Sequence, residues 1–311
     1  MQGATEASAI GPAAIVPAGV IESGGFHAEA RYFIYFARRR PLFLFGLAVV
    51  LLSIIVAAIG PIVVPYDPEK ATMDILLRPS AGHPMGTDAS GYDVFSRVAA
   101  ATRIDLFIAL VATAVSMAIG TPLGAVAGFW SSARGRTRWV SEILLRLMDI
   151  IQSFPVFILA LALVAVSGPN ARNVIIGIAF VNIPVFLRLT RSAVLTTQHR
   201  AFVDAARVSG NTDLGLVFRH VLPNSMAPAL VNASATVGWS ILLTAGLSFV
   251  GAGVRPPTPE WGAIIAQGSE QFVSGHWWIS FFPGLALALT VFGYAVVGDG
   301  MRIFLDPTKR A

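Results

Sequence analysis

The sequence predicts an all-α integral membrane protein with about six transmembrane helices, and three observations support this fold class. Of the 311 residues, 55% are apolar, and the mean hydropathy is +0.71. Charged residues make up only 13% of the chain, against roughly 25% in a soluble globular domain. The apolar residues also gather in stretches close to the ~20 residues that a helix needs to cross a bilayer. Most of the surface is therefore expected to face lipid.

Six apolar stretches are candidate spans within one transmembrane domain, which we expect over residues 31–311. Residues 1–30 are rich in Ala, Gly, Ile and Pro without a period, and we expect a disordered tail there. Gly168-Pro169-Asn170 is a turn signal that separates the third and fourth stretches. The expected spans are 42–64, 104–130, 144–166, 174–189, 226–250 and 277–297.

Basic residues are divided unevenly between the two sides of the predicted bundle. With six spans the two termini share a side, and that side carries 16 of the 22 Lys and Arg residues. Cytoplasmic loops keep such an excess, so both termini are predicted to be cytoplasmic, in a multi-pass protein. The segments 65–103 and 251–275 then face outward. The same rule accounts for the net charge of +5, so the expected partner is the lipid bilayer and not a nucleic acid.

The chain lacks the signatures of several catalytic and metal sites. Cysteine is absent, which excludes disulfides and thiolate metal sites. No G-x-x-x-x-G-K-[ST] run is present, so no ATP site is expected in this chain. His83, Asp88 and Asp93 are candidate metal ligands in principle, but their Gly, Pro, Thr and Ser neighbours favour turn and capping roles. We therefore expect no metal site.

The predicted cytoplasmic loop has the pattern of a helical hairpin over 201–223. Its first helix places four residues on one face, at i, i+3, i+4 and i+7: Phe202, Ala205, Ala206 and Ser209. Gly210 is suited to end that helix, and Thr212 to cap a second one. The expected apolar face of the second helix is Leu214, Val217, Phe218 and Val221. The pattern alone leaves two interpretations open, a docking element for a partner and a cap packed on its own bundle.

Small and polar residues inside the expected spans indicate helix contacts or a pathway. Small residues four apart allow close helix packing, and the second span contains Gly120, Gly124 and Gly128. Asp149 and Gln152 lie near the inner end of the third span, where polar side chains face a bundle interior or a water-filled path. A polar stripe follows the fifth span at Asn232, Thr236, Ser240 and Thr244. Pathway lining and helix–helix hydrogen bonding both remain open for these residues.

Several motifs resemble those of permease subunits from binding-protein-dependent ABC importers. Asp204-Ala205-Ala206, Gly210 and Leu222-Pro223 are similar to the family's "EAA…G…LP" loop, with Asp where Glu is usual. Within that family the resemblance is to the second permease of the dipeptide/oligopeptide (and nickel) group. The resemblance extends over roughly residues 40–308. Tyr92 stands where the family usually has Arg. Four further segments carry the resemblance: His83-Pro-Met-Gly-Thr-Asp88 with Asp93, Ser153-Phe154-Pro155 after Asp149, Leu247 to Val254 with Pro256 to Gly262, and Gly298 to Pro307.

The resemblance implies a fold, partners and site residues. The implied fold is that of a type I ABC importer permease, in the cytoplasmic (inner) membrane of a bacterium. The implied partners are a second homologous permease, two ATP-binding subunits that hold ATP and Mg, and an extracytoplasmic substrate-binding protein; this chain would hold no cofactor and would be no enzyme. The coupling residues would be Phe202, Asp204, Ala205, Ala206, Gly210, Leu222 and Pro223, with Arg200 and His220 flanking them. The implied contacts with the binding protein are Gly86, Thr87, Asp88, Glu260 and Trp261, although gate packing is an alternative for the last two.

The predicted function is therefore import of peptides by the transmembrane subunit of an ATP-driven system. Nickel, opines and glutathione are alternative substrates, because related permeases carry them. A secondary transporter driven by an ion gradient is a second alternative, but it predicts inverted repeats and buried carboxylates at the membrane midplane. Asp149 is the one acid that suits such a site. A membrane-embedded enzyme is disfavoured because all five histidines lie outside the expected spans and no H-E-x-x-H or G-x-S-x-G run occurs.

Overall fold

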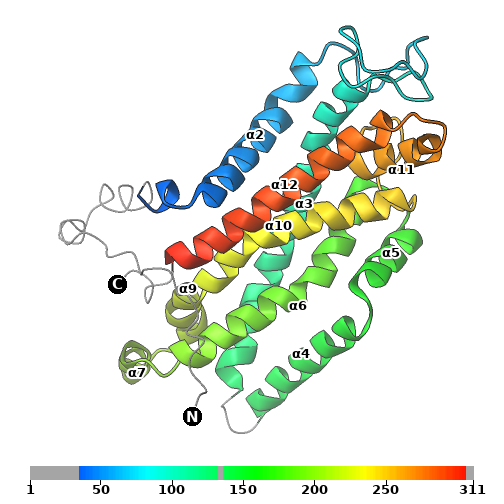
Figure 1. The fold of residues 1–311 in the computed structure, drawn as a ribbon. Coiled ribbons are helices and arrows are strands. Elements are labelled where there is room, and N and C mark those ends of the chain that lie inside the picture. The colour runs from blue at the N-terminus through cyan, green and yellow to red at the C-terminus, as the bar shows by residue number, and fades with distance from the viewer. Residues whose placement is uncertain (1–34, 132–135, 306–311) are drawn as a thin grey trace, which may run out of the picture.

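A computed structural model of the chain describes residues 35–131 and 136–305, so the predicted disordered tail lies outside the described residues. The described part is helical, and its one β-bridge is the isolated pair Thr87–Asp93. Long helices lie roughly side by side and shorter ones lie at the two ends (Figure 1). The helices are α2 (Pro41–Val63), α3 (Val94–Trp130), α4 (Arg136–Ser153), α5 (Val156–Ser167), α6 (Ala171–Thr197), α7 (Ala201–Val208), α8 (Asp213–Gly215), α9 (Leu222–Ser225), α10 (Ala227–Phe249), α11 (Trp261–Phe272) and α12 (Trp278–Leu305).

Among the described residues, five helices are long and apolar enough to cross a membrane: α2, α3, α6, α10 and α12. The bounds of α2 and α10 lie within one residue of the expected 42–64 and 226–250. The other three extend beyond the expected ranges, because hydropathy marks only the lipid-facing part of a helix. The helix α3 begins at Val94, where the Asp93 side chain accepts a hydrogen bond from the Ser96 amide and so satisfies an orphan donor of the first turn.

The expected third span, 144–166, is not one continuous helix. It is the pair α4 and α5, which meet at an angle of 90° across a short break. Pro155 lies in the break as the N-cap residue of α5. Proline has no amide hydrogen and its ring clashes with the preceding turn, so the helix ends before it. Counted as one span, the pair makes up to six spans in the described chain.

The centre of the bundle is the contact between α3 and α6, which pack most extensively. A methyl group at Gly124 would collide with the backbone carbonyl of Leu187, and one at Gly120 would lie 2.7 Å from the Ile183 carbonyl oxygen. The small residues of α3 therefore let the two backbones touch, and this confirms the predicted helix-packing role. On the other sides, α3 contacts α2 and α10.

The loop between α2 and α3 is held by buried polar contacts. Asp88 pairs with Arg97 at 3.2 Å, with both side chains nearly inaccessible. Asp88 also accepts hydrogen bonds from two amides of its own turn, and Asp93 caps α3 while contacting His83 at 2.8 Å. These are the turn and capping roles expected from the neighbouring residues. In the described residues, no three His, Cys, Asp or Glu side chains are grouped to hold a metal ion.

Candidate functional site

The predicted hairpin is a short helix, a glycine turn and a second helical segment at one end of the bundle, which we call the hairpin end. The first helix, α7, ends at Val208, and the turn that follows contains Gly210, whose φ of +84° is the left-handed conformation that glycine adopts without strain. The Thr212 side chain then accepts a hydrogen bond from the Gly215 amide as the N-cap of α8. A π-helical segment, Leu216–Val221, and α9 complete the hairpin.

The hairpin is anchored by apolar side chains that enter the bundle. Val203, Leu216, Val217 and Val221 are fully buried against the ends of α3 and α6, in a cluster with Ala125 and Val194. The expected apolar face was partly wrong, since Leu214 and Phe218 are 53% and 45% exposed while Leu216 is inside. A π-helical turn holds more residues than an α-turn, so it shifts the side of the helix on which each later residue lies. The structure therefore shows a cap that packs on its own bundle and also exposes a second face.

The exposed face of the hairpin carries most of the residues implied as coupling residues. Phe202, Asp204 and Ala205 are exposed, and Asp204 makes a solvent-exposed ion pair with Arg207 at 3.4 Å. A depression of about 360 Å³ lies beside them, between the end of α3 and α7. Arg200, Gly210 and Pro223 are also exposed, while Ala206, His220 and Leu222 are half-buried. The arrangement offers apolar and charged groups on a well-anchored scaffold.

The polar stripe of α10 is mostly buried between helices. Ser240 lies 3.4 Å from the Thr113 hydroxyl of α3 and 3.3 Å from the Asn182 amide nitrogen of α6. The Thr244 and Thr236 hydroxyls bond to carbonyl oxygens one turn earlier in their own helix, and Asn232 donates to Thr236. Of the two interpretations left open, the structure shows hydrogen bonding within and between helices. Thr236, Ser240 and Thr244 line no path in this chain because their side chains are enclosed.

The remaining pathway candidates lie at an accessible place on α4. Asp149 forms a 2.8 Å ion pair with Arg188 of α6, and both side chains are about half exposed. One turn later, the Gln152 amide oxygen is buried without a hydrogen-bond partner. Sequence reasoning proposed the acid but missed its arginine, because 39 residues separate the two in the chain. A half-exposed charged pair between α4 and α6 suits a surface that meets water or another subunit.

The residues implied as contacts for a binding protein are inside the chain. They lie at the opposite end of the bundle, which we call the α11 end, and all five are buried: Gly86, Thr87, Asp88, Glu260 and Trp261. Each has an internal role, as when the Trp278 ring nitrogen donates to the Thr87 carbonyl. A direct contact with a partner is therefore not open to these side chains here. Of the two options for Glu260 and Trp261, the structure favours packing.

Glu260 and Trp261 join α11 to α3 through a residue that sequence reasoning missed, Asp105. The Glu260 carboxylate caps α11 by accepting from the Gly262 and Ala263 amides. Trp261 donates its amide to Asp105 at 3.1 Å and its ring nitrogen to the Val98 carbonyl at 3.1 Å. Asp105 and Glu260 also interact with each other, and burial raises the pKa of the Glu260 carboxyl.

Comparisons with known proteins identify the family to which this chain belongs. Residues 120–311, more than half of the chain, match the family model described as "Binding-protein-dependent transport system inner membrane component". The chain belongs to this family. Residues 32–79 of the permease also match the N-terminal transmembrane domain of oligopeptide transport permease C. As a component of such a system it is the inner-membrane permease and not the catalytic subunit.

Its relatives include several named transport permeases. The chain is 40% identical over 269 residues to the di/tripeptide transport system permease protein DppC of Pseudomonas aeruginosa, covering 84% of this chain and 86% of that one. It is 38% identical over 265 residues to the glutathione transport system permease protein GsiD of Pectobacterium atrosepticum, covering 84% and 85%. A chain of the inward-facing MetNI methionine ABC transporter shares the fold at a TM-score of 0.52 and 19% identity, covering 65% and 94%.

Proposed function

We propose that this permease is a transmembrane subunit of an ATP-driven importer of di- or oligopeptides. The observation that supports the proposal is the exposed hairpin face on a buried anchor, in a chain 40% identical to a di/tripeptide permease. In this proposal the hairpin docks on a separate ATP-binding subunit, of which the complex has two. Closure of those subunits would move the anchored helices as near-rigid bodies. A second homologous permease supplies the other half of the pathway, and an extracytoplasmic binding protein delivers the substrate.

The proposed orientation places both termini and the hairpin end in the cytoplasm. The uneven distribution of basic residues supports this choice. The α11 end, with the loop before α3, then faces the binding protein. ATP and Mg are bound by the ATP-binding subunits in this proposal, and this chain contributes no cofactor site.

Docking and transport can be tested together in a reconstituted complex. The four kinds of subunit are co-expressed, purified in detergent and placed in liposomes, and ATP-driven uptake of a labelled dipeptide is measured. Ala205→Arg puts a long charged side chain on the exposed face of α7, so we expect it to abolish co-purification of the ATP-binding subunit. Val273→Arg makes the same change at a 97% exposed residue of the other end and should leave co-purification intact. Equal retention of the subunit by both variants would contradict the coupling assignment.

Glutathione is the second candidate substrate, because a glutathione permease is nearly as similar to this chain as the peptide permease. Both substrates carry ammonium and carboxylate groups, so one pathway suits either. Competition decides between them, with unlabelled dipeptide, tripeptide and glutathione added to the uptake assay. Inhibition by glutathione at concentrations where dipeptides have no effect would identify glutathione as the substrate and reject the hypothesis of a peptide importer. Uptake that follows an ion gradient without ATP would instead reject the ATP-driven system.

A further inference from the structure

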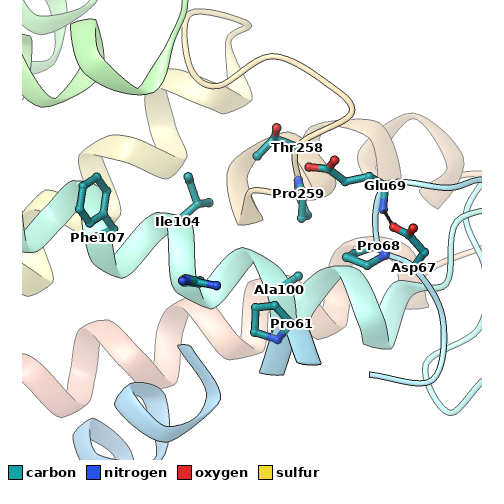
Figure 2. Close-up of a pocket in the computed structure, with 10 residues that line it drawn as sticks. Pro61, Asp67, Pro68, Glu69, Ala100, Ile104, Phe107, Thr258 and Pro259 are labelled. Atoms are coloured by element: carbon teal, nitrogen blue, oxygen red, sulfur yellow. Dashed lines mark hydrogen bonds between the residues drawn. The ribbon is translucent and has the colours of Figure 1, made fainter. Parts of the chain in front are cut away.

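The α11 end contains a pocket of about 500 Å³ between α3 and the two loops of that end. Figure 2 shows Phe107, Ile104 and Ala100 in a row on α3, with Thr258 and Pro259 across from them. Pro61 of α2 and the turn after α2 close the remaining side (Figure 2). The volume lies within the ~300–1,000 Å³ of pockets that bind small molecules.

The two main walls of this pocket are fixed to each other. Glu260 and Trp261 directly follow the Pro259 wall, and they bind Asp105 and the Val98 carbonyl on α3. Because these groups are buried and hydrogen-bonded, the walls are held at a set distance without a ligand. A pocket that is already formed loses little ordering entropy when a ligand enters it.

The pocket is mostly apolar but carries charges of both signs. Arg103 lines it and makes no ion pair with any described residue. Glu69 likewise has no ion-pair partner in the part of the chain described, and Figure 2 shows its carboxylate reaching toward Thr258. The third charge, Asp67, is occupied by Lys70 at 2.8 Å and by the Glu69 amide at 3.0 Å. One guanidinium and one carboxylate are therefore open to a ligand.

We propose that this pocket binds a short zwitterionic peptide, with the peptide carboxylate at Arg103 and its ammonium at Glu69. A guanidinium pairs with a carboxylate through parallel hydrogen bonds, and a carboxylate is the natural partner of an ammonium. The apolar faces of Ile104 and Phe107 accept peptide side chains of any shape. An extended di- or tripeptide is about 7–11 Å long, which suits a pocket of this volume. This inference rests on the proposed function and adds to it a binding site for the substrate on its way into the pathway.

Labelling the complete complex with a photoreactive dipeptide tests the site directly. After irradiation, mass spectrometry locates the label, and competing peptides measure what the pocket recognises. In the wild type we expect label on α3 around Phe107 or on the Thr258–Pro259 segment. A free dipeptide should displace it about tenfold better than its C-amidated or its N-acetylated form, since each loses one charge-assisted contact.

The variants assign each end of the peptide to a residue. Arg103→Gln should lose the preference for a free carboxylate and keep that for a free amine, and Glu69→Gln should do the reverse. Arg103→Lys retains the charge and should retain a carboxylate preference. The matched controls are Arg78→Gln and Glu270→Gln, which change exposed charges of the same end outside the pocket and should behave as the wild type.

Three results would overturn the inference. The first is label elsewhere in the wild type, and the second is an unchanged preference in the Arg103→Gln and Glu69→Gln variants. The third is displacement of the label by phosphatidylethanolamine and not by dipeptide, which would make the pocket a lipid site. Uptake by the wild-type complex is measured in parallel. If dipeptide uptake is present, a negative result rejects the pocket alone; if ATP-driven uptake is absent, the proposed function fails as well.

Discussion

Truncating Leu216 should loosen the hairpin without removing any group from its exposed face. This side chain is fully buried against α3 and α6. Leu→Ala changes at such sites cost about 2–5 kcal/mol, and we take about 3 kcal/mol because the cluster is small. Since 1.4 kcal/mol is a factor of ten, opening of the hairpin should become about 10²-fold more frequent.

Hydrogen exchange with mass spectrometry measures this opening on the purified permease. Peptides covering α7 to α9 should exchange about 10²-fold faster in Leu216→Ala. Leu214→Ala is the matched control, because Leu214 is two residues away and 53% exposed, and it should change stability by less than about 0.5 kcal/mol. Equal exchange in the two variants would refute the anchoring argument, and faster exchange in Leu214→Ala alone would show that the exposed and buried faces are assigned the wrong way round.

Three further predictions follow from the glycines and the buried acid. Gly124→Ala should lower the unfolding temperature of the purified permease, because the new methyl group meets the Leu187 carbonyl. Gly284→Ala is the control and should leave the unfolding temperature unchanged, because no atom lies within 4 Å of the added methyl group. Equal unfolding temperatures for the two variants would contradict the close packing of α3 against α6. Gly210→Ala has free space but needs φ +84°, so it should destabilise the hairpin by about 1–2 kcal/mol, measured by the same exchange experiment, and unchanged exchange would reject the left-handed turn. Because the pKa of Glu260 is raised in the folded state, the attachment of α11 should weaken as pH rises through that pKa. Exchange of α11 amides, expressed as protection relative to the intrinsic rate at each pH, tests this, and Glu260→Gln should reduce the dependence; protection that stays constant or increases as pH rises would refute it.

The helices, the hairpin turn and the family motifs could be predicted from local sequence. Hydropathy located α2 and α10 to within a residue, and the Gly210–Thr212 pair marked the stop and start of the hairpin helices. These features depend on residues close in the chain. By contrast, the buried face of the second hairpin helix was partly wrong, since the π-helical segment alters the periodicity on which that prediction relied.

Contacts between distant segments were beyond sequence reasoning. Asp149 forms an ion pair with Arg188, and Glu260 interacts with Asp105, and the two members of each pair are far apart in the sequence. The motif residues Gly86 and Trp261 were expected to contact a partner, yet both are buried. The Trp261 ring nitrogen donates to the Val98 carbonyl of α3, and Gly86 lies against the Trp278 ring of α12. A motif records which residues are needed, and only packing decides whether they face a partner or the core.

The sequence by itself determined that this chain is a multi-helix membrane protein, because composition and local motifs specify spans and turns, and the resemblance of its motifs pointed to a permease of a binding-protein-dependent system. The tertiary structure decided that the third span is broken, that the α10 stripe is enclosed, and that one hairpin face is free. It also decided that Arg103 and Glu69 share a pocket. The physical reason is that burial and charge pairing are properties of side chains brought together from different helices, and no single segment contains them.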